Sequence, residues 1–320
     1  MLLNVKHLST HFISSKGVLK AVDDISFSIN KGEILALVGE SGSGKSVTAL
    51  SLLRLIPNPP GKITGGEIVF ENRDLLKLNP EDMRQVRGNR IAMIFQEPMT
   101  SLHPILSIEE QVMEPLIHHK GIQRTKALNA CYQLLEKVHI SDPPIRGKSY
   151  PHMLSGGMKQ RSMIAMALSC NPSLIIADEP TTALDVTIQA QLLELLKDLT
   201  NEMGTSMLLI THDLGIVARY AHIVHVMYAG KIVEKASIET LYSYPRHPYT
   251  MALMASIPRI DQDCRKKLTP VQGNPPDLFN IPKGCAFHPR CPKKQEKCME
   301  ETPKLIPLAN NHETACWIYE

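Results

Sequence analysis

The sequence has little of what marks secreted, membrane-spanning or nucleic-acid-binding chains. Its formal net charge is only +3 over 320 residues, and it contains no basic stripe that would attract a nucleic-acid polyanion. No apolar run approaches the ~18 unbroken residues that suggest a membrane helix. Residues 1–12 alternate polar and apolar positions and lack the apolar core of a secretory signal. We therefore expect a cytoplasmic protein with no nucleic-acid partner.

The composition does not require disulfides. The seven cysteines, in a reducing compartment, are expected to be thiols or metal ligands. A hydrophobic content of 43% supports a large core. Because domains usually run ~100–200 residues, this length predicts one large α/β domain with a smaller appended segment.

Residues 39–46, GESGSGKS, match the phosphate-binding pattern G-x-x-x-x-G-K-[ST] at every position. A buried-strand run at 34–38 precedes the loop, and a helical run at 47–55 follows it. Gly42 and Gly44 allow the backbone to approach an anion, while Lys45 supplies charge for the terminal phosphates. The Ser46 hydroxyl is placed to complete a magnesium shell. We assign the following residues to the nucleotide: Gly39, Ser41, Gly42, Ser43, Gly44, Lys45, Ser46 and Val47.

Three further strand runs, at 90–95, 174–177 and 206–210, end in polar residues. Ligands bind at the carboxyl ends of strands in open α/β sheets. Phosphoryl transfer needs one acid to hold magnesium and one to activate water, so Asp178 is assigned to the metal and Glu179 to the general base. Gln96 is a candidate metal or water contact and His212 a candidate γ-phosphate contact. Away from a phosphate site, a single glutamine is usually an ordinary loop residue and a single histidine is usually structural.

From 98 to about 165 helical periodicity replaces strand alternation, which predicts an inserted helical subdomain. Residues 128–138 form its clearest amphipathic helix. The segment closes at residues 154–161, LSGGMKQR, where Ser155 can cap a helix. Gly156 and Gly157 leave the start of that helix open to an anion. A plain helix cap that binds no phosphate explains the same residues.

Taken in order, GESGSGKS, Gln96, LSGGMKQR, IIADEP, ALD and His212 resemble the ATP-binding cassette of ABC transporters over about the first 250 residues. The LSGGMKQR segment is the decisive part of the resemblance, because other P-loop families lack it. The resemblance implies head-to-tail pairing with a second, related cassette. The segment Ser155 to Gly157 of one chain would then complete the ATP site of the other, with Asp185 at the dimer seam. It also implies an adenine-stacking aromatic, which falls at Phe12 if residues 13–16 are an insertion.

Residues 241–250, 273–278 and 99–104 resemble the ATPase subunits of dipeptide and oligopeptide importers, although His103 replaces their usual asparagine. This resemblance implies an ATP- and Mg²⁺-dependent ATPase that drives peptide import. Its partners would be two integral-membrane permease subunits and an extracytoplasmic solute-binding protein. The chain itself would lie at the cytoplasmic face of the inner membrane. Importers of nickel or other metal chelates share these features. A soluble ABC ATPase of DNA repair or translation is disfavoured, because the chain has one phosphate loop and no sustained heptads.

The expected fold is therefore α/β, a P-loop NTPase cassette of the ABC type with an antiparallel β subdomain and an inserted helical subdomain. The cassette would span residues 1–255, and a small cysteine-containing extension would span 256–320. We expect Cys298→Ser to loosen residues 284–320 of the extension and to leave ATP binding by the cassette intact.

Four cysteines of this extension stand in the pattern C-x₅-C-x₆-C-x₁₇-C: Cys285, Cys291, Cys298 and Cys316. The segment has few large apolar residues, so a cross-link is the expected source of its order. Four thiolates suit either a structural zinc ion or an iron–sulfur cluster, and uncoordinated thiols are the remaining reading. The wide spacings and Pro292 favour [4Fe–4S], and the segment resembles the cluster-bearing extension of some peptide-importer ATPases. The other cysteines, Cys131, Cys170 and Cys264, are expected to be ordinary residues.

Overall fold

The computed structural model describes residues 1–97, 101–181, 185–256 and 270–320. Its centre is an eight-stranded sheet. In chain order this sheet contains β3 (Ile34–Val38), β6 (Ile91–Ile94), β7 (Leu174–Asp178), β8 (Ser206–Thr211), β9 (Ile223–Tyr228), β10 (Lys231–Ser237), β11 (Ile306–Pro307) and β12 (Glu313–Thr314). In space the order is β11-β12-β10-β9-β3-β8-β7-β6, with β3 paired in parallel with both β8 and β9.

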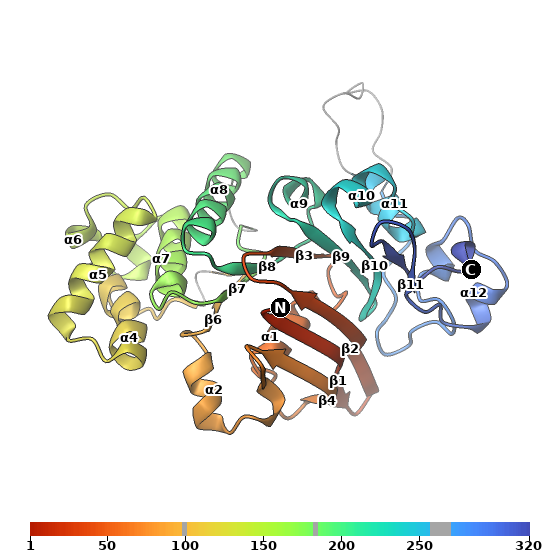
Figure 1. The fold of residues 1–320 in the computed structure, drawn as a ribbon, viewed down its shortest axis with the longest axis horizontal. Helices are drawn as coiled ribbons and strands as arrows, with labels where there is room; N and C mark the ends of the chain where they lie inside the picture. The colour runs from red at the N-terminus through yellow and green to blue at the C-terminus, as the bar shows by residue number, and fades with distance from the viewer. Residues whose placement is uncertain (98–100, 182–184, 257–269) are drawn as a thin grey trace.

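A second, four-stranded antiparallel sheet packs against one face of the first (Figure 1). It contains β1 (Leu3–Ser14), β2 (Gly17–Ile29), β4 (Gly61–Phe70) and β5 (Arg73–Asp74), in the spatial order β2-β1-β4-β5. Shifts in register near His7 let β1 continue its pairing with both β2 and β4 along its length. The expected antiparallel β subdomain is thus confirmed.

The apolar strands of the central sheet are buried on both faces, and their side chains alternate between two cores. On β3, Leu35 and Leu37 point into the core shared with the antiparallel sheet. Ile34, Ala36 and Val38 point into the core shared with the helices. Such double burial explains why these strands are continuous apolar runs and not alternating patterns.

The helices of the chain fall before, within and after the inserted helical part. Their bounds are α1 (Lys45–Leu52), α2 (Pro80–Val86), α4 (Ile108–Lys120), α5 (Arg124–Lys137), α6 (Pro143–Arg146), α7 (Gly156–Leu168), α8 (Val186–Glu202), α9 (Leu214–Tyr220), α10 (Ile238–Ser243), α11 (Pro248–Ala255) and α12 (Lys297–Glu300). None of these described helices combines the length and the apolar character needed to cross a lipid bilayer.

The helical subdomain is confirmed as a bundle of α4, α5, α6 and α7 beyond the β6 edge (Figure 1). A capping box of Ser107 and Glu110 starts α4, and Gly121 in the left-handed region ends it. The residues Ala127, Cys131 and Leu135 of α5 are buried at a spacing of one helical turn, as its amphipathic pattern predicts. Residues 98–100 lie outside the described residues, and the division of the chain at residue 255 remains a prediction.

The C-terminal extension is built into the central sheet, and this corrects the expectation that a cross-link alone orders it. Its strand β12 pairs with β10, and the backbone N–H of Ala315 donates to the Val233 carbonyl at 2.8 Å. Phe287 is only 1% exposed and packs against the rings of Tyr228 and Tyr249. Backbone pairing and aromatic burial therefore contribute to holding the segment in place.

A buried carboxylate lies where the extension joins β10 of the central sheet. Glu234 of β10 is 0% exposed. It accepts hydrogen bonds from the backbone N–H groups of Arg246 and His247, at 2.6 and 2.9 Å, just before α11 begins. His312 Nε2, from the extension, lies 2.7 Å from the same carboxylate. Because a buried carboxylate is costly unless it is fully hydrogen-bonded, this cluster specifies how the extension is seated.

Stability should depend on pH through His225, which is buried on β9 beside Phe27. Burial lowers the pKa of His225 from 6.5 to about 3, and the Lys235 charge adds to the effect. The folded state therefore keeps the His225 ring neutral. The neutral ring makes its whole contribution to the free energy of unfolding above the pKa of the unfolded state, and this contribution is lost as the pH falls toward 3. We expect His225→Leu to reduce the loss of stability on acidification by up to ~1.4 kcal/mol per pH unit.

Urea unfolding of the wild type and of His225→Leu at several pH values between 7 and 4 measures this difference. Parallel stability curves for the two proteins would show that His225 does not titrate as its burial requires.

Candidate nucleotide site

The phosphate loop follows β3, and α1 begins at its last positions, as the motif predicts. Lys45 Nζ donates to the carbonyl oxygens of Gly39 at 2.8 Å and Glu40 at 3.0 Å. Burial lowers the pKa of Lys45, and the nearby carboxylates of Glu179, Asp178 and Glu40 oppose that shift. The ammonium group is thus held at the loop by two backbone carbonyls.

The glycines of the loop serve two different purposes. Gly42, with φ +78°, faces open space where a Cβ would meet nothing within 4 Å. A Cβ on Gly44 would lie 2.2 Å from the carbonyl oxygen of Ala21, and one on Gly39 would lie 2.2 Å from that of Met227. Gly44 is therefore needed for packing against β2, and its role in the close approach of an anion stays a prediction.

The start of α1 offers unpaired donors to an anion. Its N-cap, Gly44, provides no side-chain cap, so the first N–H groups of the helix are not capped by that residue. The Ser43 hydroxyl is buried and has no hydrogen-bond partner among the described residues. An orphaned hydroxyl beside a helix amino terminus fits a phosphate group in chemistry and in charge.

At the end of β7, Asp178 is only 5% exposed and accepts a hydrogen bond of 3.1 Å from the Ser46 hydroxyl. Burial raises the pKa of Asp178, while the Ser46 hydrogen bond opposes the shift. Carboxylate and hydroxyl oxygens are hard ligands of the type Mg²⁺ prefers, and Mg²⁺ usually takes the rest of its shell from phosphates and water. In the described residues no group of three or more His, Cys, Asp or Glu side chains is placed to hold a metal ion. Mg²⁺ at this place would therefore depend on nucleotide oxygens.

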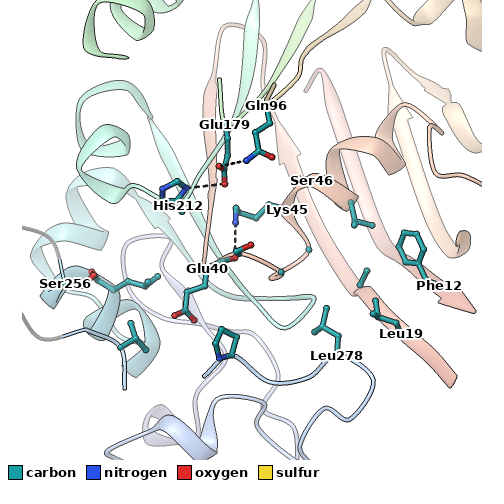
Figure 2. A pocket seen from close by; sticks show the side chains of 18 of the residues that line it. Phe12, Leu19, Glu40, Lys45, Ser46, Gln96, Glu179, His212, Ser256 and Leu278 are labelled. Atoms are coloured by element: carbon teal, nitrogen blue, oxygen red, sulfur yellow. Dashed lines mark hydrogen bonds and ion pairs between the residues drawn. The ribbon is translucent and has the colours of Figure 1, made fainter. Parts of the chain in front are cut away.

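Glu179 is the centre of a polar cluster at the same sheet edge (Figure 2). Gln96 Nε2 donates to Glu179 Oε2 at 3.1 Å, and His212 Nδ1 lies 3.2 Å from Oε1. The backbone of Glu179 has a φ of +44°, an unfavourable value for a residue with a side chain. The structure thus brings together the three residues that the sequence assigns to catalysis.

The cleft at this edge has a volume of about 1010 Å³. The phosphate loop, Gln96, Glu179 and His212 line it, and Phe12 and Leu19 of the antiparallel sheet line it as well (Figure 2). The segment after residue 255 also contributes lining residues: Ser256, Pro270, Val271, Pro275 and Leu278. The extension therefore forms part of the cleft wall.

The start of α7, which the sequence predicts to be open to an anion, lies outside this cleft. Ser155 caps α7 by accepting a 3.3 Å hydrogen bond from the N–H of Met158, as predicted. Ser155 and Gly156 are exposed, Gly157 is half-buried, and none of the three lines the cleft. Asp185, exposed at the start of α8, does not line it either. Ala183 and Leu184 of the ALD motif, together with Met99, Thr100 and Cys264, lie outside the described residues.

The four cysteines of the extension line one small cavity, together with His288. Burial raises the pKa of Cys285 to about 11, and the neighbouring thiols Cys298, Cys316 and Cys291 add to the shift. All four are free thiols, as are Cys131 and Cys170. The four side chains converge as the spacing predicts, but they are not arranged as metal ligands. A metal group at this place is therefore not shown.

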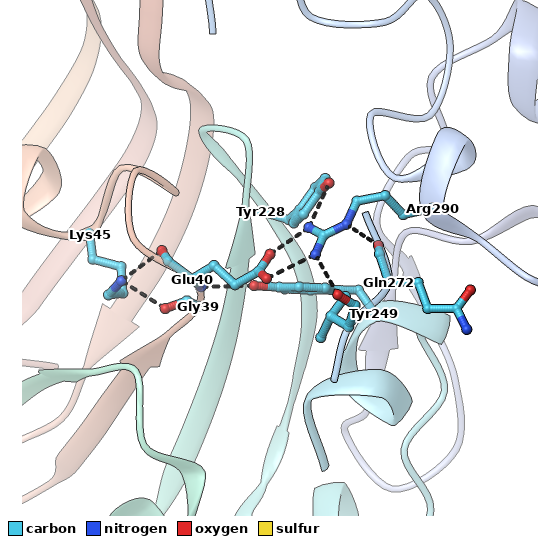
Figure 3. A network of polar contacts seen from close by, with 8 residues as sticks. Gly39, Glu40, Lys45, Tyr228, Tyr249, Gln272 and Arg290 are labelled. Carbon is cyan, nitrogen blue, oxygen red and sulfur yellow. Dashed lines mark hydrogen bonds and ion pairs between the residues drawn. The ribbon is translucent and has the colours of Figure 1, made fainter. Parts of the chain in front are cut away.

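An ion pair that sequence reasoning does not predict joins the phosphate loop to the extension (Figure 3). Arg290 Nη1 and Nη2 donate to Glu40 Oε2 and Oε1 at 2.6 and 2.9 Å. The two residues are 250 positions apart. No periodicity or motif spacing connects positions so far apart.

The fold and the cleft define a P-loop cassette that binds and hydrolyses a nucleoside triphosphate. The chain matches the ABC transporter family over residues 22–182, and the family described as the oligopeptide/dipeptide transporter C-terminal region over residues 233–298. It therefore belongs to the ABC transporter ATPases that carry this C-terminal region, and it is an ATP-hydrolysing subunit of that family. The family and fold expected from the sequence are confirmed.

Individual relatives agree with this assignment. The chain is 51% identical to the oligopeptide transport ATP-binding protein AppD of Bacillus subtilis, over all of this chain (100%) and 97% of that protein. It is 47% identical to the dipeptide transport ATP-binding protein DppD of the same organism, over 99% of this chain and 95% of that protein. A solved structure of the ATP-binding cassette MJ0796, a dimer bound to ADP and Pi, superposes with a TM-score of 0.67 at 26% identity, covering 74% of this chain and 99% of that one.

Proposed function

We propose that this chain hydrolyses ATP to drive the import of dipeptides or oligopeptides through partner permeases. The observation that carries the proposal is the cleft itself, whose wall combines the phosphate loop and Glu179 with a C-terminal region of the peptide-transporter type. The relatives described above are named for oligopeptide and dipeptide transport, which favours peptides over nickel or another metal chelate. We place the chain at the cytoplasmic face of the inner membrane, with two permease subunits and an extracytoplasmic solute-binding protein.

The cleft residues have distinct proposed roles. Lys45 and the N–H groups at the start of α1 bind the phosphates, while Ser46 and Asp178, with Gln96, hold Mg²⁺. Glu179 takes the proton of the attacking water, because its carboxylate is held between Gln96 and His212 and does not rotate freely. His212 contacts the γ-phosphate from the end of β8.

Phe12 is the proposed adenine contact. It lines the cleft on the antiparallel sheet, and Leu19 lines the same side, so an apolar surface is available to a base. Leu19 remains the alternative for this contact, whereas Val18 does not line the cleft.

The position of Ser155 supports a head-to-tail pair of cassettes. Its hydroxyl and the bare backbone of Gly156 are exposed, away from the cleft of their own chain. A facing cassette would bring its nucleotide to this helix start, where N–H groups and the helix dipole favour phosphate. Asp185, exposed at the start of α8, would lie at the seam. We propose a second, related ATPase subunit as the natural partner.

The converging thiols of the extension are proposed to hold a metal group, with [4Fe–4S] favoured over zinc. Four sulfur donors from one small cavity are the ligand set of both groups. The raised pKa of Cys285 means that binding must displace a proton from that thiol.

The first prediction tests the chemistry. Glu179→Gln should keep ATP binding while hydrolysis falls by ~10²–10⁴, the usual effect of losing a general base. Lys45→Ala should lose binding itself. Turnover is to be measured in the assembled transporter, since each site needs a facing cassette, and nucleotide affinity by titration. Glu81→Gln, at an exposed ion pair with Arg84, is the matched control. Near-normal turnover of Glu179→Gln would reject the assignment.

The second prediction tests the cargo. Cells whose only copy of the chain is Lys45→Ala should lose uptake of labelled dipeptides and oligopeptides and keep uptake of radioactive nickel. The wild-type chain should copurify with integral-membrane permeases from detergent-solubilised membranes. Loss of nickel uptake with intact peptide uptake would identify a metal-chelate importer in place of a peptide importer.

The third prediction tests the metal group. Anaerobic purification should give a brown protein with roughly four irons and matching sulfide per chain. Cys298→Ser should lose the iron, whereas Cys170→Ser, a buried cysteine outside the extension, should keep it. A colourless wild-type protein with one zinc would replace the cluster by zinc, and a protein without metal would leave the four cysteines as ordinary thiols.

A further inference from the structure

Every N–H donor of the Arg290 guanidinium is used, and the partners come from three parts of the chain. Two donors form the fork to the Glu40 carboxylate. The others reach the Tyr228 hydroxyl at 3.3 Å and the carbonyls of Val271 at 3.3 Å and Gln272 at 2.8 Å (Figure 3). Five donors in one rigid plane are specific to arginine. Arg290 thus links the extension to the phosphate loop and to the end of β9.

Glu40 is held at three points, of which Arg290 provides one. Its N–H donates to the Tyr249 hydroxyl of α11 at 2.8 Å. Its carbonyl accepts from Lys45 Nζ at 3.0 Å, and its carboxylate accepts the fork from Arg290. Glu40 therefore has its backbone N–H and its carboxylate bound by groups outside the loop, and its carbonyl bound by Lys45 within the loop.

The negative charge of Glu40 connects its pairing with Arg290 to phosphate binding. The carboxylate belongs to the loop that must accept a triphosphate, and it acts electrostatically on the Lys45 ammonium. The side chains of Arg290 and Glu40 are 5% and 24% exposed, so water screens their charges weakly. Without Arg290, an uncompensated negative charge would stand beside the phosphates and compete with them for Lys45.

We propose that Arg290 is a positioning residue for nucleotide binding, which neutralises Glu40 and fixes the phosphate loop. The affinity of the cassette for a triphosphate then depends on the extension being seated. This inference rests on the proposed ATP-binding function and adds to it a requirement that lies outside the phosphate loop. It also revises the expectation that loosening the extension leaves ATP binding intact.

The test compares full-length variants by titration with a fluorescent ATP analogue in the presence of Mg²⁺, with ATP, ADP and AMP as competitors. Arg290→Ala should weaken ATP binding roughly tenfold, within the coupling range of residues in one hydrogen-bonded network. Arg290→Lys should fall between this variant and the wild type, since an ammonium keeps the charge and loses the fork. The loss should shrink from ATP to ADP and nearly vanish for AMP.

A second substitution separates positioning from folding. Glu40→Gln removes the charge that Arg290 neutralises, so Glu40→Gln combined with Arg290→Ala should bind ATP more tightly than Arg290→Ala alone. Lost packing of the extension would not be repaired by this change. Glu320→Gln, which breaks an exposed ion pair with Lys297 in the same extension, is the matched control and should bind ATP as the wild type does.

Failure of the Arg290 inference can be distinguished from failure of the proposed ATP-binding function. If Lys45→Ala loses ATP binding and Arg290→Ala does not, the inference is overturned and the nucleotide site stands. An equal loss for AMP and ATP, or no recovery in the double variant, also overturns it. If Lys45→Ala binds ATP as well as the wild type, the assigned site itself is rejected.

Discussion

The parallel pairing of β3, β8 and β7 is the constraint on which the nucleotide site depends. In this register Val38 is paired with Thr211, and Asp178 with Ile210, so three strand ends lie at one edge. The backbone N–H of Glu179 continues the ladder by donating to Ile210 at 2.9 Å. The burial of these strands on both faces fixes the register, because a shift by one residue would exchange the two cores. The packing of these strands between two apolar cores thus positions the candidate catalytic residues.

The parts of the site that the sequence predicts are those whose chemistry is local. The phosphate loop, Asp178 with Glu179, and the Ser155 cap each lie within a few residues of the strand or helix that positions them. Their placement requires only the direction of that element and the rule that parallel strands present their carboxyl ends together. For the same reason the three candidate catalytic residues could be grouped before any distance was known.

The parts that the sequence does not predict depend on pairings between distant segments. The need for glycine at Gly44 comes from the carbonyl of Ala21, on a strand of the other sheet. The order of the extension comes from pairing between β10 and β12, which are short and have no distinctive pattern. A composition poor in large apolar residues suggested a separate, cross-linked module. It does not reveal that the buried side chain of Phe287 packs into the main core.

The nucleotide cleft lies between the helical subdomain and the C-terminal extension, which join opposite edges of the central sheet. The helical subdomain lies beyond the β6 edge, and the extension adds β12 and β11 at the opposite edge, with β3 and its loop between them (Figure 1). A phosphate group at the loop would touch Lys45, whose other partner is the backbone of Glu40, and Glu40 is bound to the extension. Glu179 extends the same cleft toward Gln96, just after β6. Direct contacts thus run from the phosphate loop toward the extension at one edge of the sheet and from Glu179 toward Gln96 at the other.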